Sequence, residues 1–217
     1  MKTPAFTKTY RNRTVLDMPE LELREGMLTA VIGPNGSGKS TLARVLAGIE
    51  RDDRKTQFLP GVSVGYMPQK SYAFRMSTER NILLNGADGT RAAQLMEALQ
   101  INSLAGQSAK KLSGGETAKM ALCRILMGSY DLLILDEPAA AMDMESTLTA
   151  EKLIRNSCEK DGCAVLLITH SIQQARRIAD QVIFLHQGRL VETGDTEQVL
   201  QNPKQEQTRR FLEFYGV

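Results

Sequence analysis

The stretch MLTAVIGPNGSGKST, residues 27–41, decides the fold. Its first six residues are almost entirely apolar, which is typical of a parallel-sheet strand covered on both faces. A glycine-rich loop of pattern G-x-x-x-x-G-K-S follows, and a helix is predicted over residues 39–48. Backbone N–H groups of such a loop wrap phosphates, while Lys39 places a cation on the outer two and the Ser40 hydroxyl binds Mg²⁺. The predicted nucleotide contacts here are Gly33, Pro34, Asn35, Gly36, Ser37, Gly38, Lys39, Ser40 and Thr41.

Two adjacent carboxylates follow a second buried strand, predicted over residues 132–136. We expect Asp136 to hold the metal through water and Glu137 to polarise the attacking water. A general base supplies about 10²–10⁴-fold in rate, and phosphoryl transfer otherwise needs positioning and charge neutralisation. The alternative is a solvated acidic turn that closes a strand.

Two further polar side chains follow predicted strands at residues 164–169 and 62–66. Ligands of α/β proteins bind at the carboxyl edge of the sheet. His170 is expected there, hydrogen-bonded to the terminal phosphate and holding the water in line with Glu137, although a structural histidine is the alternative. Gln69 is expected to ligate Mg²⁺ or the attacking water and to act as a hinge. The predicted catalytic residues are Lys39, Gln69, Glu137 and His170.

A second anion site is predicted at the pentapeptide LSGGE, residues 112–116. A Ser-Gly-Gly turn that opens a helix beginning near Glu116 presents free backbone N–H groups to an anion. Two such helix starts are more than one nucleotide needs. The economical explanation is that two copies of the chain close around two nucleotides. Each triphosphate then lies between the glycine loop of one copy and Ser113, Gly114, Gly115 and Glu116 of the other.

The rest of the chain predicts an α/β fold with two additions. Alternating residues from about Ala5 to Leu23 indicate antiparallel strands, and Tyr10 within them either stacks on adenine or is an exposed strand tyrosine. Helical patterns replace strands between Gln69 and Leu112, clearest over residues 90–100. A hairpin is predicted from strands 182–185 and 190–192, joined by residues 186–189, and a terminal helix over residues 204–215.

Composition excludes several classes of protein. The 217 residues carry 27 Lys+Arg and 25 Asp+Glu, so no global basic field indicates nucleic acid. No apolar run approaches the roughly 18 residues of a membrane span, and we expect a cytosolic protein that reaches a membrane through partners. Cys123, Cys158 and Cys163 are scattered, as in a reducing compartment. A metal site at Cys158 and Cys163 is disfavoured because the chain has only 2 histidines.

Taken together, these motifs resemble the ATP-binding cassette (ABC) ATPases in order and spacing over nearly the whole chain. The resemblance implies a P-loop NTPase fold in one domain, residues 1–217, that binds ATP and Mg²⁺. Residues 1–68 and 129–217 would form a RecA-like core with an N-terminal antiparallel β subdomain, and residues 69–128 a small inserted helical subdomain with the signature motif. It further implies a head-to-tail homodimer in which Asp143 communicates between sites. Transmembrane permease subunits would dock near Gln69, and a substrate-binding protein would be an indirect partner.

Finer features favour one branch of the family. A cassette separate from its permease resembles bacterial importers, residues 174–185 look like oxyanion or amino-acid importers, and residues 68–74 resemble tungstate systems. Aromatic and apolar residues in the stretch 71–76 fit a permease contact, and subdomain core is the alternative for Phe74 and Met76. The sequence departs from the family at 139–142, where the absent hydroxyl at Ala140 affects contacts between subunits, and the helical insert is short. The alternatives are an amino-acid or other small-solute importer, a non-transport ABC ATPase and a P-loop kinase.

Overall fold

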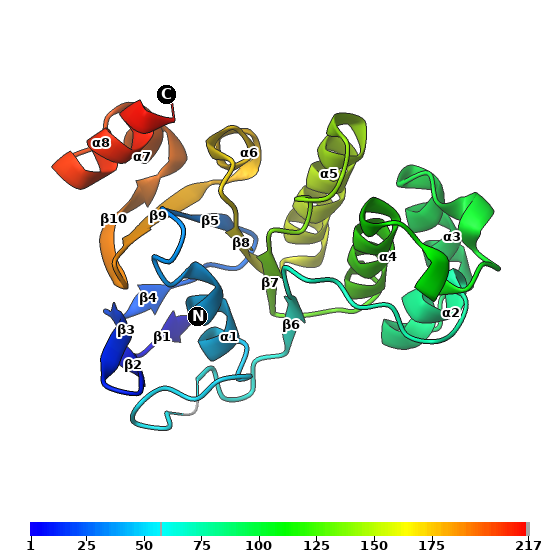
Figure 1. Ribbon diagram of the computed structural model, residues 1–217, viewed down its shortest axis with the longest axis horizontal. Coiled ribbons are helices and arrows are strands. Elements are labelled where there is room, and N and C mark those ends of the chain that lie inside the picture. The colour runs from blue at the N-terminus through cyan, green and yellow to red at the C-terminus, as the bar shows by residue number, and fades with distance from the viewer. Residues whose placement is uncertain (57, 216–217) are drawn as a thin grey trace.

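The computed structural model describes residues 1–56 and 58–215, and one eight-stranded sheet organises it. The strand order is β2-β3-β10-β9-β5-β8-β7-β6 (Figure 1). Strands β9, β5, β8, β7 and β6 are mutually parallel, so the predicted α/β class with a mainly parallel core is confirmed. The bounds are β1 Lys2–Thr3, β2 Phe6–Tyr10, β3 Arg13–Met18, β4 Leu21–Glu22, β5 Leu28–Ile32, β6 Val64–Met67, β7 Leu132–Asp136, β8 Ala164–Ile168, β9 Gln181–His186 and β10 Arg189–Asp195.

The antiparallel strands are continuous with the core sheet, which the sequence did not predict. β2 pairs with β3 and β9 with β10, both antiparallel, and β10 then pairs with β3 in parallel. β1 and β4 form a separate two-stranded pair. The predicted turn of the second hairpin was too long: Gln187 and Gly188 alone lie between the strands, both at positive φ, as in a two-residue turn. His186 therefore ends β9 and does not belong to the turn.

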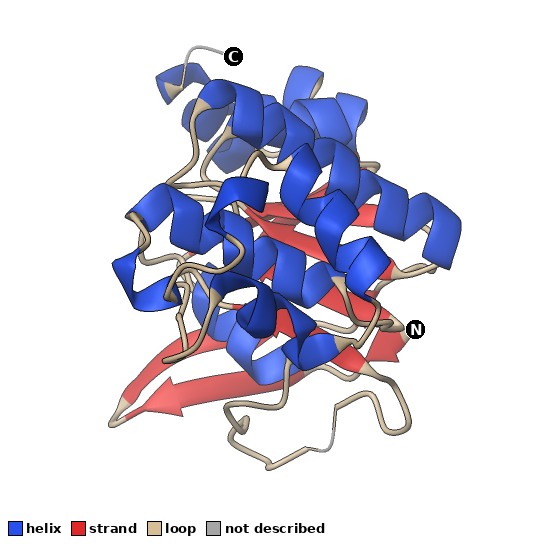
Figure 2. Ribbon diagram, turned by 90° about the vertical axis from the view of Figure 1, so that its right-hand side faces the viewer, coloured by secondary structure: helices blue, strands red, loops and turns tan. Residues whose placement is uncertain are grey.

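Helices cover both faces of the sheet, and Figure 2 shows most of them in front of its strands. Alternation along β7 divides the core: Leu132 and Ile134 pack with α1, whereas Leu133 and Leu135 pack with α4 and α5. The helices are α1 Lys39–Leu46, α2 Thr78–Ile82, α3 Gly89–Ala98, α4 Gly114–Leu126, α5 Met144–Asp161, α6 Ile172–Ile178, α7 Thr196–Gln201 and α8 Glu206–Phe214, with short 3-10 turns at Leu83–Asn85, Asn102–Leu104 and Ala109–Lys111.

Helices α2, α3 and α4 lie together at one end of the molecule, beyond β6 (Figure 1). Their apolar residues join the same core as α5, and Met120 is fully buried there. In the part of the chain that the structure describes, the polar links to α5 from α3 and from the residues just after it are few and exposed. Arg91 Nη2 lies 3.8 Å from Asp161 Oδ2, and Gln100 Nε2 donates to Glu145 at 3.2 Å.

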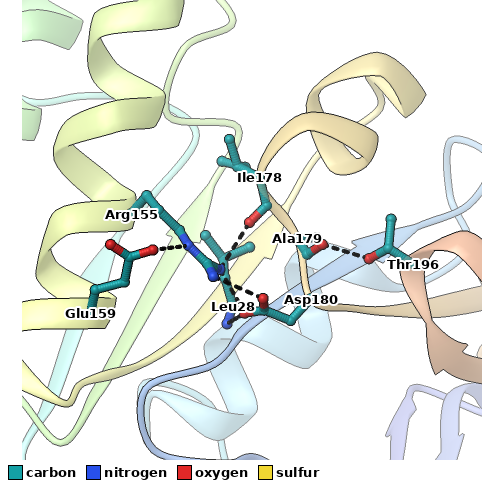
Figure 3. A network of polar contacts seen from close by, with 7 residues as sticks. All are labelled: Leu28, Arg155, Glu159, Ile178, Ala179, Asp180 and Thr196. Atoms are coloured by element: carbon teal, nitrogen blue, oxygen red, sulfur yellow. Dashed lines mark hydrogen bonds and ion pairs between the residues drawn. The ribbon is translucent and has the colours of Figure 1, made fainter.

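An ion pair between α5 and the residue that precedes β9 ties the central strands together (Figure 3). Arg155 donates to both carboxylate oxygens of Asp180, at 2.6 and 2.9 Å. Asp180 in turn accepts from the backbone N–H of Leu28 at 2.8 Å, where β5 begins. Because β5 leads directly into the phosphate loop, this network fixes the strand that carries the loop.

Candidate nucleotide site

The phosphate loop surrounds its own lysine. Lys39 Nζ donates to the carbonyl oxygens of Gly33 at 2.8 Å and Pro34 at 2.9 Å. Burial lowers the pKa of Lys39, against the opposing effect of Glu137 and Asp136. Gly38 caps α1 with φ 105°, and a Cβ there would lie 2.7 Å from Leu16, so this position requires glycine. The loop thus holds a mostly buried cation next to free N–H groups at the start of α1.

A cavity of about 450 Å³ lies beside the loop. It brings together three of the predicted strand-end residues, Gln69, Asp136 and Glu137, with the helix start that carries Lys39. The parallel strands β6 and β7 end next to one another and explain this convergence. The lining residues are Val15, Asn35, Gly36, Gly38, Lys39, Ser40, Thr41, Gln69, Asp136, Glu137 and Ile168.

Asp136 has the chemistry of a magnesium ligand. The residue is 2% exposed, and within the described residues its Oδ1 has no hydrogen-bond partner. Burial raises the pKa of Asp136, and the Ser40 hydroxyl acts in the opposite direction. An unpartnered buried carboxylate oxygen beside a hydroxyl and the Gln69 amide is a hard oxygen set that fits Mg²⁺.

Glu137 and His170 form one unit at the sheet edge. Glu137 adopts φ 54°, an uncommon conformation for a residue other than glycine, and its N–H donates to Ile168 O at 2.9 Å. This turn directs its carboxylate to His170, whose Nδ1 lies 2.6 Å from Glu137 Oε2. The Glu137 side chain is 10% exposed and that of His170 60%. The histidine therefore holds a sheltered carboxylate and keeps its other ring nitrogen free for solvent or ligand.

The Ser113 segment lies outside this cavity, on α4. The helix begins at Gly114 and not near Glu116, which corrects the predicted start by two residues. The physical reason is a capping box: Glu116 N donates to Ser113 Oγ at 3.3 Å, and Ser113 N donates to the Glu116 carboxylate at 2.7 Å. Gly114 and Gly115 thus form the first turn, where N–H groups have no acceptor within the helix.

Two other predicted residues also lie away from the phosphate cavity. Tyr10 is at the exposed end of β2, where its hydroxyl pairs with Glu50. Asp143 caps α5, accepting from Ser146 N at 2.8 Å and from Ser146 Oγ at 2.7 Å. These hydrogen bonds lower the pKa of Asp143 to about 2.

The sequence reasoning missed two residues near these motifs. Val15 lines the phosphate cavity from β3, and Lys119 on α4 lies 3.6 Å from Asp143. The only sequence feature at Val15 is the alternation of polar and apolar residues typical of a strand, which does not indicate a cavity. Lys119 could have been found more readily, because it follows Gly115 by four residues and therefore lies on the same face of the helix.

Comparison with known proteins identifies the family. Residues 16–140, more than half of the chain, match the model of the ABC transporter family. The chain belongs to the ABC transporter ATPases. The resemblance inferred from its motifs is therefore confirmed, and the P-loop kinase alternative is set aside.

Relatives of this ABC ATPase include subunits of importers. It is 38% identical over 200 residues to the tungstate uptake system ATP-binding protein TupC of Peptoclostridium acidaminophilum, covering 85% of this chain and 94% of the relative. It is 35% identical over 217 residues to the aliphatic sulfonates import ATP-binding protein SsuB 1 of Streptomyces avermitilis, covering 98% and 82%.

Solved structures share the fold of this ABC ATPase at lower identity. A bacterial Atm1-family ABC exporter with ATP bound superposes with a TM-score of 0.85 at 23% identity, over 98% of this chain and 41% of that one. A dimeric ATP-binding cassette in a post-hydrolysis state with ADP and Pi gives 0.79 at 22%, over 90% and 98%. Within residues 1–56 and 58–215, no helix is both long and apolar enough to cross a membrane.

Proposed function

We propose that this ABC ATPase drives import through a membrane permease by closing as a homodimer around ATP. One observation carries the proposal: Lys39, Asp136 and Glu137 meet at one cavity, whereas the anion-binding turn at Ser113 lies outside that cavity. A triphosphate held at Lys39 is capped by Ser113, Gly114 and Gly115 of a second copy. The core of each copy is residues 1–68 and 129–217, and its helical subdomain is residues 69–128.

The chain's own groups have distinct roles in hydrolysis. Lys39 moves its hydrogen bonds from the carbonyl oxygens of Gly33 and Pro34 to the outer phosphates. Glu137 accepts the proton of the attacking water, while His170 fixes the carboxylate in line with the terminal phosphate. Ser40 and Gln69, together with Asp136 through water, would hold Mg²⁺, which when bound would supply neutralisation of the phosphate charge.

The permease contact is proposed on the helical subdomain next to Gln69. Tyr72 and Phe74 are 57% and 42% exposed, and their rings pack edge to face at 5.0 Å. Arg124 donates to Tyr72 O at 2.9 Å and covers the Phe74 ring at 5.3 Å, while Lys110 lies 4.4 Å from the Tyr72 ring centroid. An exposed aromatic pair held by cations supports a docking surface for a helix that ends in acidic groups. The subunit would then sit on the cytosolic face of the membrane, with a substrate-binding protein beyond the permease.

The proposed cargo is tungstate or another oxyanion. The residues at 68–74 support this, as do the names of relatives that act on tungstate and on aliphatic sulfonates. An amino-acid or other small-solute importer remains the second reading of residues 174–185. Uptake assays of the chain with its permease, using labelled tungstate, sulfate and amino acids in turn, decide between them.

The experiment on the ATPase and dimer uses Glu137→Gln. This variant is expected to bind Mg-ATP, to lose about 10²–10⁴-fold of hydrolysis and to sediment as a dimer only with Mg-ATP. Glu197→Gln on α7 is the matched control and should behave as the parent. A Glu137→Gln chain that stays monomeric at high protein and Mg-ATP concentration contradicts the proposal.

A further inference from the structure

One face of α4 touches the segment between β7 and α5 within the same subunit. A Cβ on Gly115 would lie only 2.8 Å from the carbonyl oxygen of Ala141, so glycine allows the two backbones to approach. Four residues further along α4, Lys119 Nζ lies 3.6 Å from Asp143 Oδ2. Because residues i and i+4 share a helix face, both contacts come from one side of α4.

The ion pair joins a sheltered cation to an oriented anion. The Lys119 side chain is 13% exposed, and that of Asp143 is 63% exposed. Ser146 fixes the Asp143 carboxylate with two hydrogen bonds, so the oxygen that faces Lys119 has a set direction. The backbone contact at Gly115 limits the distance between α4 and the loop, and the ion pair limits their rotation.

We propose that Lys119 is a positioning residue that joins the Ser113 turn to the loop of residues 138–143. The Ser113 turn, which caps the partner's nucleotide, and the loop that carries Asp143 then move as one rigid body. This inference rests on the proposed ATP-bound homodimer and names what orients the surfaces that close it. Gly115 and Asp143 are its two anchoring points on the same subunit.

The test compares dimer formation with nucleotide binding. In the Glu137→Gln background, Lys119→Met removes the charge but keeps the apolar stem, and Lys119→Gln serves as a second neutral variant should the first not fold. Dimer dissociation is measured by sedimentation in Mg-ATP, and ATP affinity by calorimetry at a protein concentration where the chain is monomeric. We expect the dissociation constant of the dimer to rise about fivefold, while the affinity of the monomer for ATP stays unchanged. Lys119→Arg is expected to restore the parent value, and exposed Lys152→Met on α5 is the control.

A double-mutant cycle separates positioning from general stabilisation. If the pair acts as one unit, adding Asp143→Asn to Lys119→Met weakens the dimer no further. Additive losses, or a Lys119→Met chain that dimerises like its parent, overturn the inference and leave the proposed function intact. A Glu137→Gln parent that never dimerises overturns both.

Discussion

Two parts of this protein are stabilised in different ways: the sheet half, which contains the eight-stranded sheet and α5, and the helical half, formed by α2, α3 and α4. In the sheet half, Arg155 and Asp180 pair at 2.6 Å and are both mostly covered. Between α3 and α5, Arg91 and Asp161 lie 3.8 Å apart with 38% and 44% of their side chains exposed. The first arrangement fixes the strand that leads to the phosphate loop, whereas the second leaves α3 weakly tied. The comparison teaches that the strand leading to the phosphate loop is firmly held, whereas α3 has only weak polar ties to α5. Helix α4, which carries the Ser113 turn, is held separately by the contact of Lys119 with Asp143.

The largest effect on the ATP affinity of the monomer is expected when the sheet half loses its anion contact. Lys39→Ala should lower the ATP affinity of the monomer about 10- to 100-fold, since hydrogen bonds to charged groups are lost. Ser113→Ala should leave this affinity unchanged, because Ser113 does not line the cavity. Calorimetric titration with Mg-ATP at low protein concentration measures both. Equal losses of ATP affinity in the two variants would contradict the claim that the monomer binds ATP through the phosphate loop and not through the Ser113 turn.

The next effect concerns stability. Arg155→Ala leaves Asp180 without its partner and should cost about 2 kcal/mol of unfolding free energy, between the values typical of exposed and buried pairs. Arg91→Ala, which removes the long exposed pair on α3, should change it by less than about 0.5 kcal/mol. Urea unfolding at pH 7 compares the two variants. A larger loss for Arg91→Ala would reverse the comparison.

Acid should weaken the sheet half in a defined pH window. Burial alone raises the pKa of Asp180, but hydrogen bonds from Arg155 and Leu28 outweigh it and lower the pKa below 3.8. A carboxyl with a lowered folded-state pKa contributes stability above its unfolded pKa and loses it as the pH falls through the folded value. The advantage of the parent over Asp180→Asn should be constant from about pH 7 to 5 and shrink below about pH 4. Urea unfolding across this range measures it, and an advantage that does not shrink at all as the pH falls below about 4 would argue against the ion pair.

The smallest effect is expected at the exposed end of β2. If Tyr10 stacks on adenine, Tyr10→Ala should raise the KM for ATP about fivefold and Tyr10→Phe should not. In the structure the Tyr10 hydroxyl pairs with Glu50, so Glu50→Gln is the matched control. Steady-state ATP hydrolysis gives the KM values. An unchanged KM in Tyr10→Ala would show that Tyr10 does not stack on adenine and that its role is the pairing with Glu50.

Local sequence predicted most of the sheet half. The continuous apolar strands that precede Gly33, Glu137 and His170 are signals within single segments, and their parallel ends explain why these residues gather. Sequence could not show that β10 pairs with β3, because that contact joins residues far apart in the chain. The direction of Tyr10 depends in the same way on Glu50, which is distant in the chain. The capping of Ser113 by Glu116 is, by contrast, a local pattern that the sequence carries and that the predicted helix start overlooked. Lys119 was missed because its partner Asp143 belongs to another element.

A disulfide between two subunits tests the central claim most directly. In the Glu137→Gln background, one chain carries Asn35→Cys at the exposed tip of the phosphate loop. The other carries Gly114→Cys, where an added Cβ meets no atom within 4 Å. The native cysteines, Cys123, Cys158 and Cys163, are buried. The account predicts that mild oxidation links the two chains in Mg-ATP and not in ADP or in a Lys39→Ala chain. Absence of the link in Mg-ATP, with both thiols reactive to a small reagent, would contradict the shared site.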